Sequence, residues 1–227
     1  MSFGLITEGT TSALFNKNTK LIAFKNGIFN LENGEFSTQN YGEYVNVVIG
    51  HDYNIEHYNV TTKVDIMNIL SCMFPDPEEL DYVLGTLSQC LTGVNKYKQI
   101  YLWLGDGSNG KSKLNGFMNE VLGRSEYYHH IDIRYFLEPQ SYKHDFTLGP
   151  LASKVYARCV FGQYAEQRKF NINKLRSVLG INDVDVRKLH GNVFTYNIKW
   201  PLFILANYLP DIFLLRKILD QIQLDLM

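Results

Sequence analysis

The stretch Gly105-Asp106-Gly107-Ser108-Asn109-Gly110-Lys111-Ser112 decides the fold of this chain. It matches the spacing G-x-x-x-x-G-K-[ST] at every fixed position. Glycines let the backbone curl so that successive N–H groups converge on one anion. A helix that begins at such a loop turns its positive end toward the same anion. The stretch therefore predicts a P-loop that wraps the phosphates of a nucleotide.

Two side chains of this loop have predicted roles of their own. Lys111 is expected to bridge the β- and γ-phosphates of ATP, and Ser112 to offer its hydroxyl to Mg²⁺. ATP and Mg²⁺ are therefore the expected cofactors, with all eight loop residues as nucleotide ligands. The alternatives are a glycine-rich turn that binds nothing and, more seriously, a site that binds nucleotide without hydrolysing it.

The sequence on both sides of the loop predicts an α/β domain. A continuous apolar run precedes the loop, as expected for a buried parallel strand, and a helical run follows it. Further strands and helices alternate downstream, which favours a parallel sheet with flanking helices. The expected strands are residues 99–104, 155–161 and 201–206, the expected helices are 114–122 and 172–179, and a strand-turn-strand is expected around Gly191.

The residues before the loop predict a smaller α+β region. Asn26-Gly27 and Asn33-Gly34 separate short apolar runs and tolerate positive φ, which indicates β-hairpins, and residues 44–49 are expected to add a strand. Helical spacing predicts two helices on either side of Pro75-Asp76-Pro77, the second over about 77–91. The predicted organisation is a poorly structured N-terminus (1–20), the hairpin and two helices (21–96), the P-loop domain (97–210) and an atypical C-terminal helix (211–227).

The composition is that of an ordinary globular protein, with 45% hydrophobic and 20% charged residues in 227. A net charge of −1 gives no support for nucleic-acid binding by bulk charge. No apolar run is long enough for a membrane span, and the N-terminus does not resemble a signal peptide. The three cysteines form no C-x-x-C pair, which favours an intracellular, reducing setting.

The segments after the loop narrow the class of protein. In order, they are Gly162-Gln163-Tyr164-Ala165-Glu166, Asp185-Val186-Arg187-Lys188-Leu189-His190-Gly191 and Leu205-Ala206-Asn207-Tyr208-Leu209-Pro210. This order resembles the superfamily 3 helicases, and in particular the poxvirus-type primase–helicase family of large DNA viruses. The resemblance begins upstream, at Phe24 to Phe36, and covers most of the chain.

The resemblance implies a fold, a function and a setting. The fold would be an AAA+-like P-loop sheet, and intact relatives would couple ATP hydrolysis to DNA unwinding during viral DNA replication. They would assemble as a homo-oligomeric, hexameric ring around single-stranded DNA, in the host cytoplasm or at a viral replication site. No membrane partner is expected.

The resemblance also gives roles to residues outside the loop. Asn207 would be the polar sensor that touches the γ-phosphate or the attacking water, although a strand-end asparagine also suits a turn. Arg187, Lys188 and His190 would lie on a hairpin that meets DNA phosphates without reading sequence. The alternative for these three is a solvated hairpin tip.

Two departures from the family pattern bear on activity. The family's second acidic motif places a glutamate two residues after its strand, where this chain has Gln163. A neutral amide cannot act as a general base or neutralise Mg²⁺. Glu166 is the nearest substitute, and its alternative is an exposed charge at a helix start. Hydrolysis is therefore expected to be slow or absent if nothing replaces the carboxylate.

The second departure is the C-terminal stretch 211–227, which has little likeness to the family. Together with the absent primase module, it suggests a copy truncated at both ends. The alternatives to an active helicase domain are a non-catalytic nucleotide-binding subunit and a decayed gene remnant. Another P-loop NTPase or a kinase is also an alternative, although residues 125–148 show no arginine-rich acceptor lid.

Overall fold

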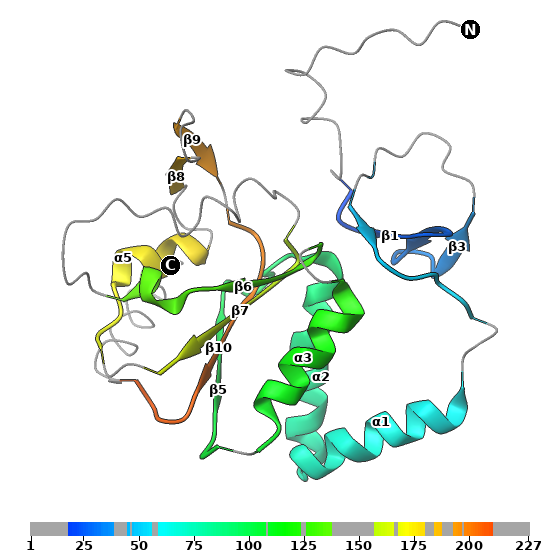
Figure 1. Ribbon diagram of the computed structural model, residues 1–227, viewed down its shortest axis with the longest axis horizontal. Coiled ribbons are helices and arrows are strands. Elements are labelled where there is room, and N and C mark those ends of the chain that lie inside the picture. The colour runs from blue at the N-terminus through cyan, green and yellow to red at the C-terminus, as the bar shows by residue number, and fades with distance from the viewer. Residues whose placement is uncertain are drawn as a thin grey trace, which may run out of the picture.

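In the computed structural model of this chain, the described residues are 18–38, 45, 47–55, 59–107, 109–123, 126–137, 157–165, 168–179, 184–187, 193–196 and 198–210. They form a small N-terminal sheet, a four-stranded parallel sheet with helices on both faces, and a separate hairpin (Figure 1).

The N-terminal sheet contains β1 (Leu21–Phe24), β2 (Gly27–Asn30), β3 (Glu35–Ser37) and β4 (Val48–Ile49) in the order β3-β2-β1-β4. The predicted hairpins are confirmed, because β1–β2 and β2–β3 are antiparallel pairs. Gly34 has the expected positive φ of 72°. Gly27 is a glycine for a different reason: a Cβ there would lie 2.3 Å from the carbonyl oxygen of Ser37.

Helices α1 (Val60–Met73) and α2 (Pro77–Thr92) follow, as predicted. The side chain of Asp76 accepts a hydrogen bond of 2.9 Å from the N–H of Glu78, which caps α2. Pro77 occupies the first turn, where its missing N–H costs nothing. Gly93 ends α2 in the left-handed region with φ 67°. Local signals thus fix both ends of this helix.

The parallel sheet confirms the predicted α/β class. Its order is β5-β10-β7-β6, and each neighbouring pair is parallel. One face packs on α2 and α3, and the other packs on α5 and a 3-10 helix, η1. The elements are β5 (Ile100–Leu104), α3 (Lys111–Leu122), β6 (Tyr128–Ile131), η1 (Ile133–Phe136), β7 (Cys159–Tyr164), α5 (Ile172–Val178) and β10 (Leu202–Ala206).

The pleat of the sheet assigns alternate residues to the two faces. Aromatic rings stack across the strands on the α3 face: the centroids of Phe161 and Phe203 are 4.8 Å apart, and those of Tyr101 and Phe203 are 4.9 Å apart. Ile22 and Ile49 of the N-terminal sheet belong to the same buried cluster. The N-terminal sheet and the parallel sheet therefore share one core.

Two cysteines meet inside this core. The Sγ atoms of Cys90 on α2 and Cys159 on β7 lie 3.1 Å apart, and both residues are fully buried as free thiols. Burial raises the pKa of Cys159 well above its ordinary value. Cys72, on α1, is exposed.

A buried arginine joins the two sheets. Arg158, directly before β7, is 6% exposed. Its guanidinium donates hydrogen bonds to the carbonyl oxygens of Thr19, Leu21 and Leu91, the first at 3.1 Å, and lies over the ring of Tyr127 at 4.3 Å. Three segments far apart in sequence thus share one cation.

The hairpin β8 (Val184–Arg187) and β9 (Val193–Tyr196) confirms the strand-turn-strand predicted around Gly191. It stands apart from the parallel sheet (Figure 1). No helix among the described residues combines the length and apolar content that crossing a bilayer requires.

Candidate functional site: a P-loop at the carboxyl edge of the sheet

The residues of the predicted P-loop lie between β5 and α3, in the strand–loop–helix context that the motif requires. Gly107 and Gly110 have φ values of 51° and 86°, in the left-handed region that glycine adopts at least cost. α3 begins at Lys111, three residues before the predicted start, because the motif's lysine and serine form its first turn. Within the described part of the chain, no side chain caps this helix start. Its first N–H groups therefore suit an anion.

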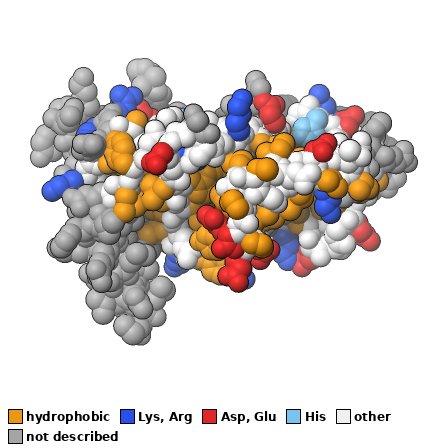
Figure 2. All heavy atoms as spheres, turned by 90° about the horizontal axis from the view of Figure 1, so that it is seen from below, with side chains coloured by type: hydrophobic (Ala, Val, Ile, Leu, Met, Phe, Trp, Pro, Cys, Tyr) orange, Lys and Arg blue, Asp and Glu red, His pale blue; other side chains and the backbone are white. Residues whose placement is uncertain are grey.

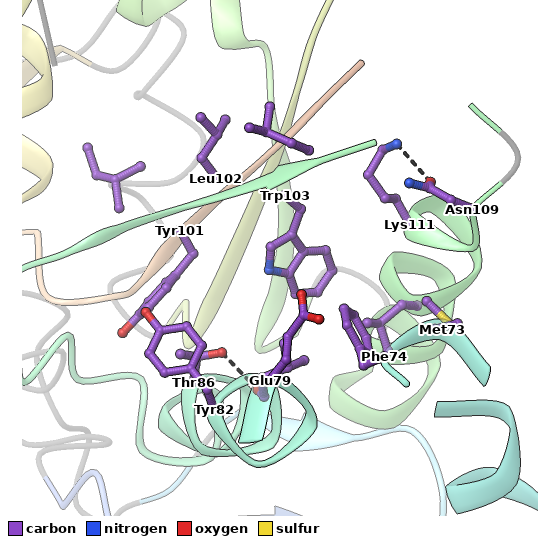
Figure 3. A pocket seen from close by; sticks show the side chains of 14 residues that line it. Met73, Phe74, Glu79, Tyr82, Thr86, Tyr101, Leu102, Trp103, Asn109 and Lys111 are labelled. Carbon is purple, nitrogen blue, oxygen red and sulfur yellow. Dashed lines mark hydrogen bonds between the residues drawn. The ribbon is translucent and has the colours of Figure 1, made fainter. Parts of the chain in front are cut away.

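Lys111 lies against the P-loop itself. Its Nζ donates to the carbonyl oxygen of Gly105 at 2.5 Å and to Oδ1 of Asn109 at 2.8 Å (Figure 3). An ammonium group has three N–H donors, so one is left for a further acceptor. The residue is half-buried. The geometry thus holds a cation beside the backbone that the motif assigns to phosphates.

A side chain at Gly105 would displace the two polar side chains that fold over it. A Cβ there would lie 1.5 Å from Nδ2 of Asn109 and 3.1 Å from Nζ of Lys111. Ser112, the predicted Mg²⁺ ligand, is exposed on the first turn of α3. Asp106 is exposed as well, and Ser108 lies outside the described residues.

The sheet brings two other predicted residues to the same edge. Leu104 of β5 pairs with Ala206 of β10, and Ala206 pairs with Tyr164 of β7. Asn207 directly follows β10 and is exposed, and Gly105 directly follows β5, so both residues lie at the same edge of the sheet. Gln163 pairs with Leu205, one position below this edge.

Both residues lie on the side of the sheet that carries the loop helix. Phe161 and Leu205 belong to the core on the α3 face. Side chains two residues apart on a strand share a face. Gln163 therefore lies on the α3 face, and the alternation carried one step past β10 puts Asn207 there too. Gln163 is exposed although its strand neighbours are buried.

The position of Gln163 corrects one sequence expectation. The strand was expected to end at residue 161, which would leave Gln163 two residues beyond it. β7 instead extends to Tyr164, so Gln163 is part of the strand. The tertiary contact responsible is the full-length parallel pairing with β10, which ends at Ala206.

The remaining predicted residues are not placed as a site. Glu166, Lys188 and His190 lie outside the described residues. Arg187 ends β8, and its backbone pairs with Val193. The roles given to these four residues remain predictions.

The structure adds a cavity that the sequence did not indicate. An open space of about 420 Å³ runs beside β5 and α2, and Lys111 and Asn109 line one part of it (Figure 3). The turn between α1 and α2 also borders it. A Cβ on Gly110 would lie 2.7 Å from Cε of Met73, so the last residue of α1 touches the loop. The helical spacing of apolar residues in α2 predicts which face of the helix is buried, but it does not indicate that a cavity lies beside that helix.

No family model matches the chain, but comparison with known proteins finds similar sequences. "Putative helicase L207/L206" of Acanthamoeba polyphaga mimivirus is 29% identical over 198 residues, which is 87% of this chain and 20% of that protein. "Putative helicase 121R" of Invertebrate iridescent virus 3 is 30% identical over 114 residues, 50% of this chain and 12% of that protein. These relatives confirm the predicted resemblance to viral helicases. The chain spans about a fifth of the length of the mimivirus protein.

Solved structures with a similar arrangement include the apo C-terminal region of NrS-1, with a TM-score of 0.44 and 14% identity over 63% of this chain and 33% of that one. A JCV helicase structure has a TM-score of 0.43 and 17% identity over 65% of this chain and 40% of that one.

Proposed function

We propose that this chain is the ATP-binding part of a superfamily 3 helicase-like protein of viral DNA replication. The observation that carries the proposal is the P-loop with its helix start and Lys111, placed beside Asn207 and Gln163 at one edge of a parallel sheet. Ligands of open α/β sheets bind at this carboxyl edge. The viral relatives support the helicase part of the proposal.

Each residue at the edge has a distinct part in nucleotide binding. The N–H groups of the loop and of the first turn of α3 would surround the phosphates, and Lys111 would neutralise their charge. Ser112 presents one hydroxyl oxygen, which suits Mg²⁺ because this ion takes few protein ligands and several phosphate and water oxygens. Bound Mg²⁺ would supply charge neutralisation between the β- and γ-phosphates. Asn207 would orient the water or the γ-phosphate through its amide.

Gln163 limits what this site does chemically. It lies on the face where a carboxylate would act on Mg²⁺ or water, but an amide can do neither. We therefore propose slow hydrolysis, with Glu166 as the only carboxylate close in sequence. The second candidate function, a nucleotide-binding subunit without turnover, is favoured by this same residue.

DNA binding would depend on a local surface. The chain has a net charge of −1. On the face in Figure 2, the Lys and Arg side chains of the described residues are scattered, while hydrophobic side chains gather over its middle with acidic ones beside them. The hairpin residues Arg187, Lys188 and His190 remain the proposed contact to single-stranded DNA. A homo-oligomeric ring would place several such hairpins around one strand.

The decisive test is ATP binding and hydrolysis by the purified protein, with and without single-stranded DNA. Lys111→Ala should weaken ATP binding by at least about ten-fold, the effect of one charge-assisted hydrogen bond. Lys113→Ala, an exposed lysine two residues along α3, is the matched control and should bind like wild type. Equal affinities for all three proteins would refute the proposal.

Gln163→Glu tests the assignment of the missing carboxylate. If Gln163 faces the bound nucleotide, a carboxylate there should raise the rate of ATP hydrolysis above that of wild type while leaving Lys111-dependent binding in place. An unchanged rate of hydrolysis would mean that position 163 is not the place where a catalytic carboxylate acts.

A further inference from the structure

We propose that the cavity along β5 receives the ribose and base of the bound nucleotide, with the triphosphate at its Lys111 end. The inference rests on the proposed ATP-binding function and adds to it the place of the nucleoside. The residues that carry it are Trp103 on β5, Phe74 in the α1–α2 turn, and Glu79 and Tyr82 on α2. All four line the cavity.

The cavity is continuous with the phosphate site and large enough for a nucleoside. Lys111 and Asn109, whose side chains bond to each other at 2.8 Å, border it directly. Its volume of about 420 Å³ lies in the range of small-molecule sites, about 300–1,000 Å³. Trp103 precedes Gly105 by two residues, which is about 7 Å along a strand. A ribose attached to phosphates at the loop would reach this ring.

Charge orients the ligand in the cavity. Lys111 supplies a cation at the phosphate end, and Glu79 supplies a carboxylate among the α2 residues (Figure 3). A carboxylate repels phosphate and only accepts hydrogen bonds. The base, which carries an amino donor in adenine, therefore suits the Glu79 end, and the triphosphate suits the Lys111 end.

Aromatic rings supply the walls. The core holds the indole of Trp103 edge-on against Phe161 and Phe203, at 5.4 and 5.3 Å between centroids. Trp103 is nevertheless partly exposed, and it borders the cavity. Tyr82 is 61% exposed although it is a large aromatic residue. Fixed or rotatable aromatic faces beside a phosphate loop are suited to stacking on a base.

The test compares ATP with inorganic tripolyphosphate, which has the phosphates but no nucleoside. Tyr82→Ala should lower the affinity for ATP by at least about five-fold, a typical loss for a stacked base, and leave tripolyphosphate binding unchanged. Tyr97→Ala, an equally exposed tyrosine outside the cavity lining, should change neither. Both affinities are measured by calorimetry on the folded chain.

Purine riboside triphosphate, which lacks the 6-amino group, tests Glu79. Wild type should prefer ATP over this analogue by several-fold, and Glu79→Ala should lose the preference. The result counts only if Glu79→Ala still binds tripolyphosphate like wild type, which excludes a folding defect; a variant that binds tripolyphosphate normally and keeps the preference for ATP would contradict the role of Glu79.

The outcomes separate the two proposals. If Lys111→Ala weakens ATP binding but Tyr82→Ala and Glu79→Ala change nothing, the P-loop assignment stands and the nucleoside lies elsewhere. The space would then suit another occupant, such as a strand paired with the outer edge of β5, which no described strand occupies. If wild type binds neither ATP nor tripolyphosphate, both proposals fail.

Discussion

Two cations in this molecule are held by backbone carbonyl groups, and they are held differently. Lys111 bonds to Gly105 and Asn109 of its own loop and remains half-buried beside a cavity. Arg158 is buried, and its three carbonyl acceptors come from two segments far apart in sequence, residues 19–21 and the end of α2. The first cation has local partners and an open side, so a phosphate can replace them. The second is enclosed, so its role is to join elements.

The difference shows what makes a cation available for a ligand. Burial lowers the pKa of Arg158, and the nearby Tyr127 opposes that shift. A guanidinium stays charged under such conditions, and its planar fork can serve several carbonyls at once. An ammonium group on a flexible stem gives up and regains partners more easily. The following predictions test this contrast, beginning with the largest expected effect.

Arg158→Leu should lower the free energy of unfolding by about 3 kcal/mol or more, because each buried carbonyl left without a donor costs about 1–3 kcal/mol. Arg134→Leu is the control, since Arg134 forms an exposed ion pair with Asp132 at 2.5 Å. That change should cost less than about 1 kcal/mol. Chemical denaturation measures both. Similar losses for the two variants would mean that Arg158 does not join the segments.

Gly105→Ala should impair ATP binding more than it impairs folding. The new Cβ would displace the Asn109 side chain and press on Lys111. Gly116→Ala on α3 is the control, because a Cβ there meets nothing within 4 Å. That control should stabilise the protein by about 0.5–1 kcal/mol. Titration with ATP and thermal melting of both variants check this. If Gly116→Ala lost as much affinity for ATP as Gly105→Ala, the argument from close packing around Gly105 would be wrong.

Lys111→Ala should change the free energy of unfolding by less than about 1 kcal/mol, as expected for a side chain that is not enclosed. Its loss of nucleotide binding should therefore occur in a protein as stable as wild type. Denaturation in the absence of nucleotide checks this. A destabilisation comparable to that of Arg158→Leu would remove the contrast between the two cations.

Alkaline pH should destabilise the protein modestly through Tyr127. Burial raises the pKa of this phenol, and Arg158 opposes the shift. The folded pKa thus exceeds the unfolded value of about 10, so the stabilisation is present below pH 10 and is lost as pH rises through the folded value.

Melting temperatures over a series of pH values from neutral to alkaline should fall more for wild type than for Tyr127→Phe. The variant loses the 2.8 Å hydrogen bond to the carbonyl of Val47 at every pH, so only the slope is informative. If the melting temperatures of the two proteins fell equally with pH, the raised pKa of Tyr127 would not be the cause of the alkaline destabilisation.

The strand–loop–helix arrangement of β5 and α3, the two helices around Pro75 and the apolar strands could be predicted because their signals are local. Pro77 and Gly93 mark the ends of α2 within its own sequence, and the P-loop motif specifies its own backbone. The extent of β7 could not be predicted, because Gly162 and Gln163 suit a turn and only the pairing with β10 keeps them extended.

The contacts of Arg158 and the contact between Cys90 and Cys159 also could not be predicted from the sequence. The partners in the hydrogen bonds of Arg158 and in the cysteine contact lie 67 or more residues away. Such contacts depend on how separate elements pack, for which one sequence carries no periodic signal. The cavity beside β5 was missed for the same reason, since α2, β5 and the α1–α2 turn form it together.

The cysteine pair has a practical consequence for spectroscopy. Cys90 and Cys159 are sealed in the core, and the raised pKa of Cys159 keeps that thiol in its unreactive, protonated form. Cys72 is the remaining cysteine, and it is exposed next to Met73, which borders the cavity. A maleimide fluorophore would therefore attach to wild-type protein at one position. Its emission would report on ligand entry beside the P-loop without any engineered residue.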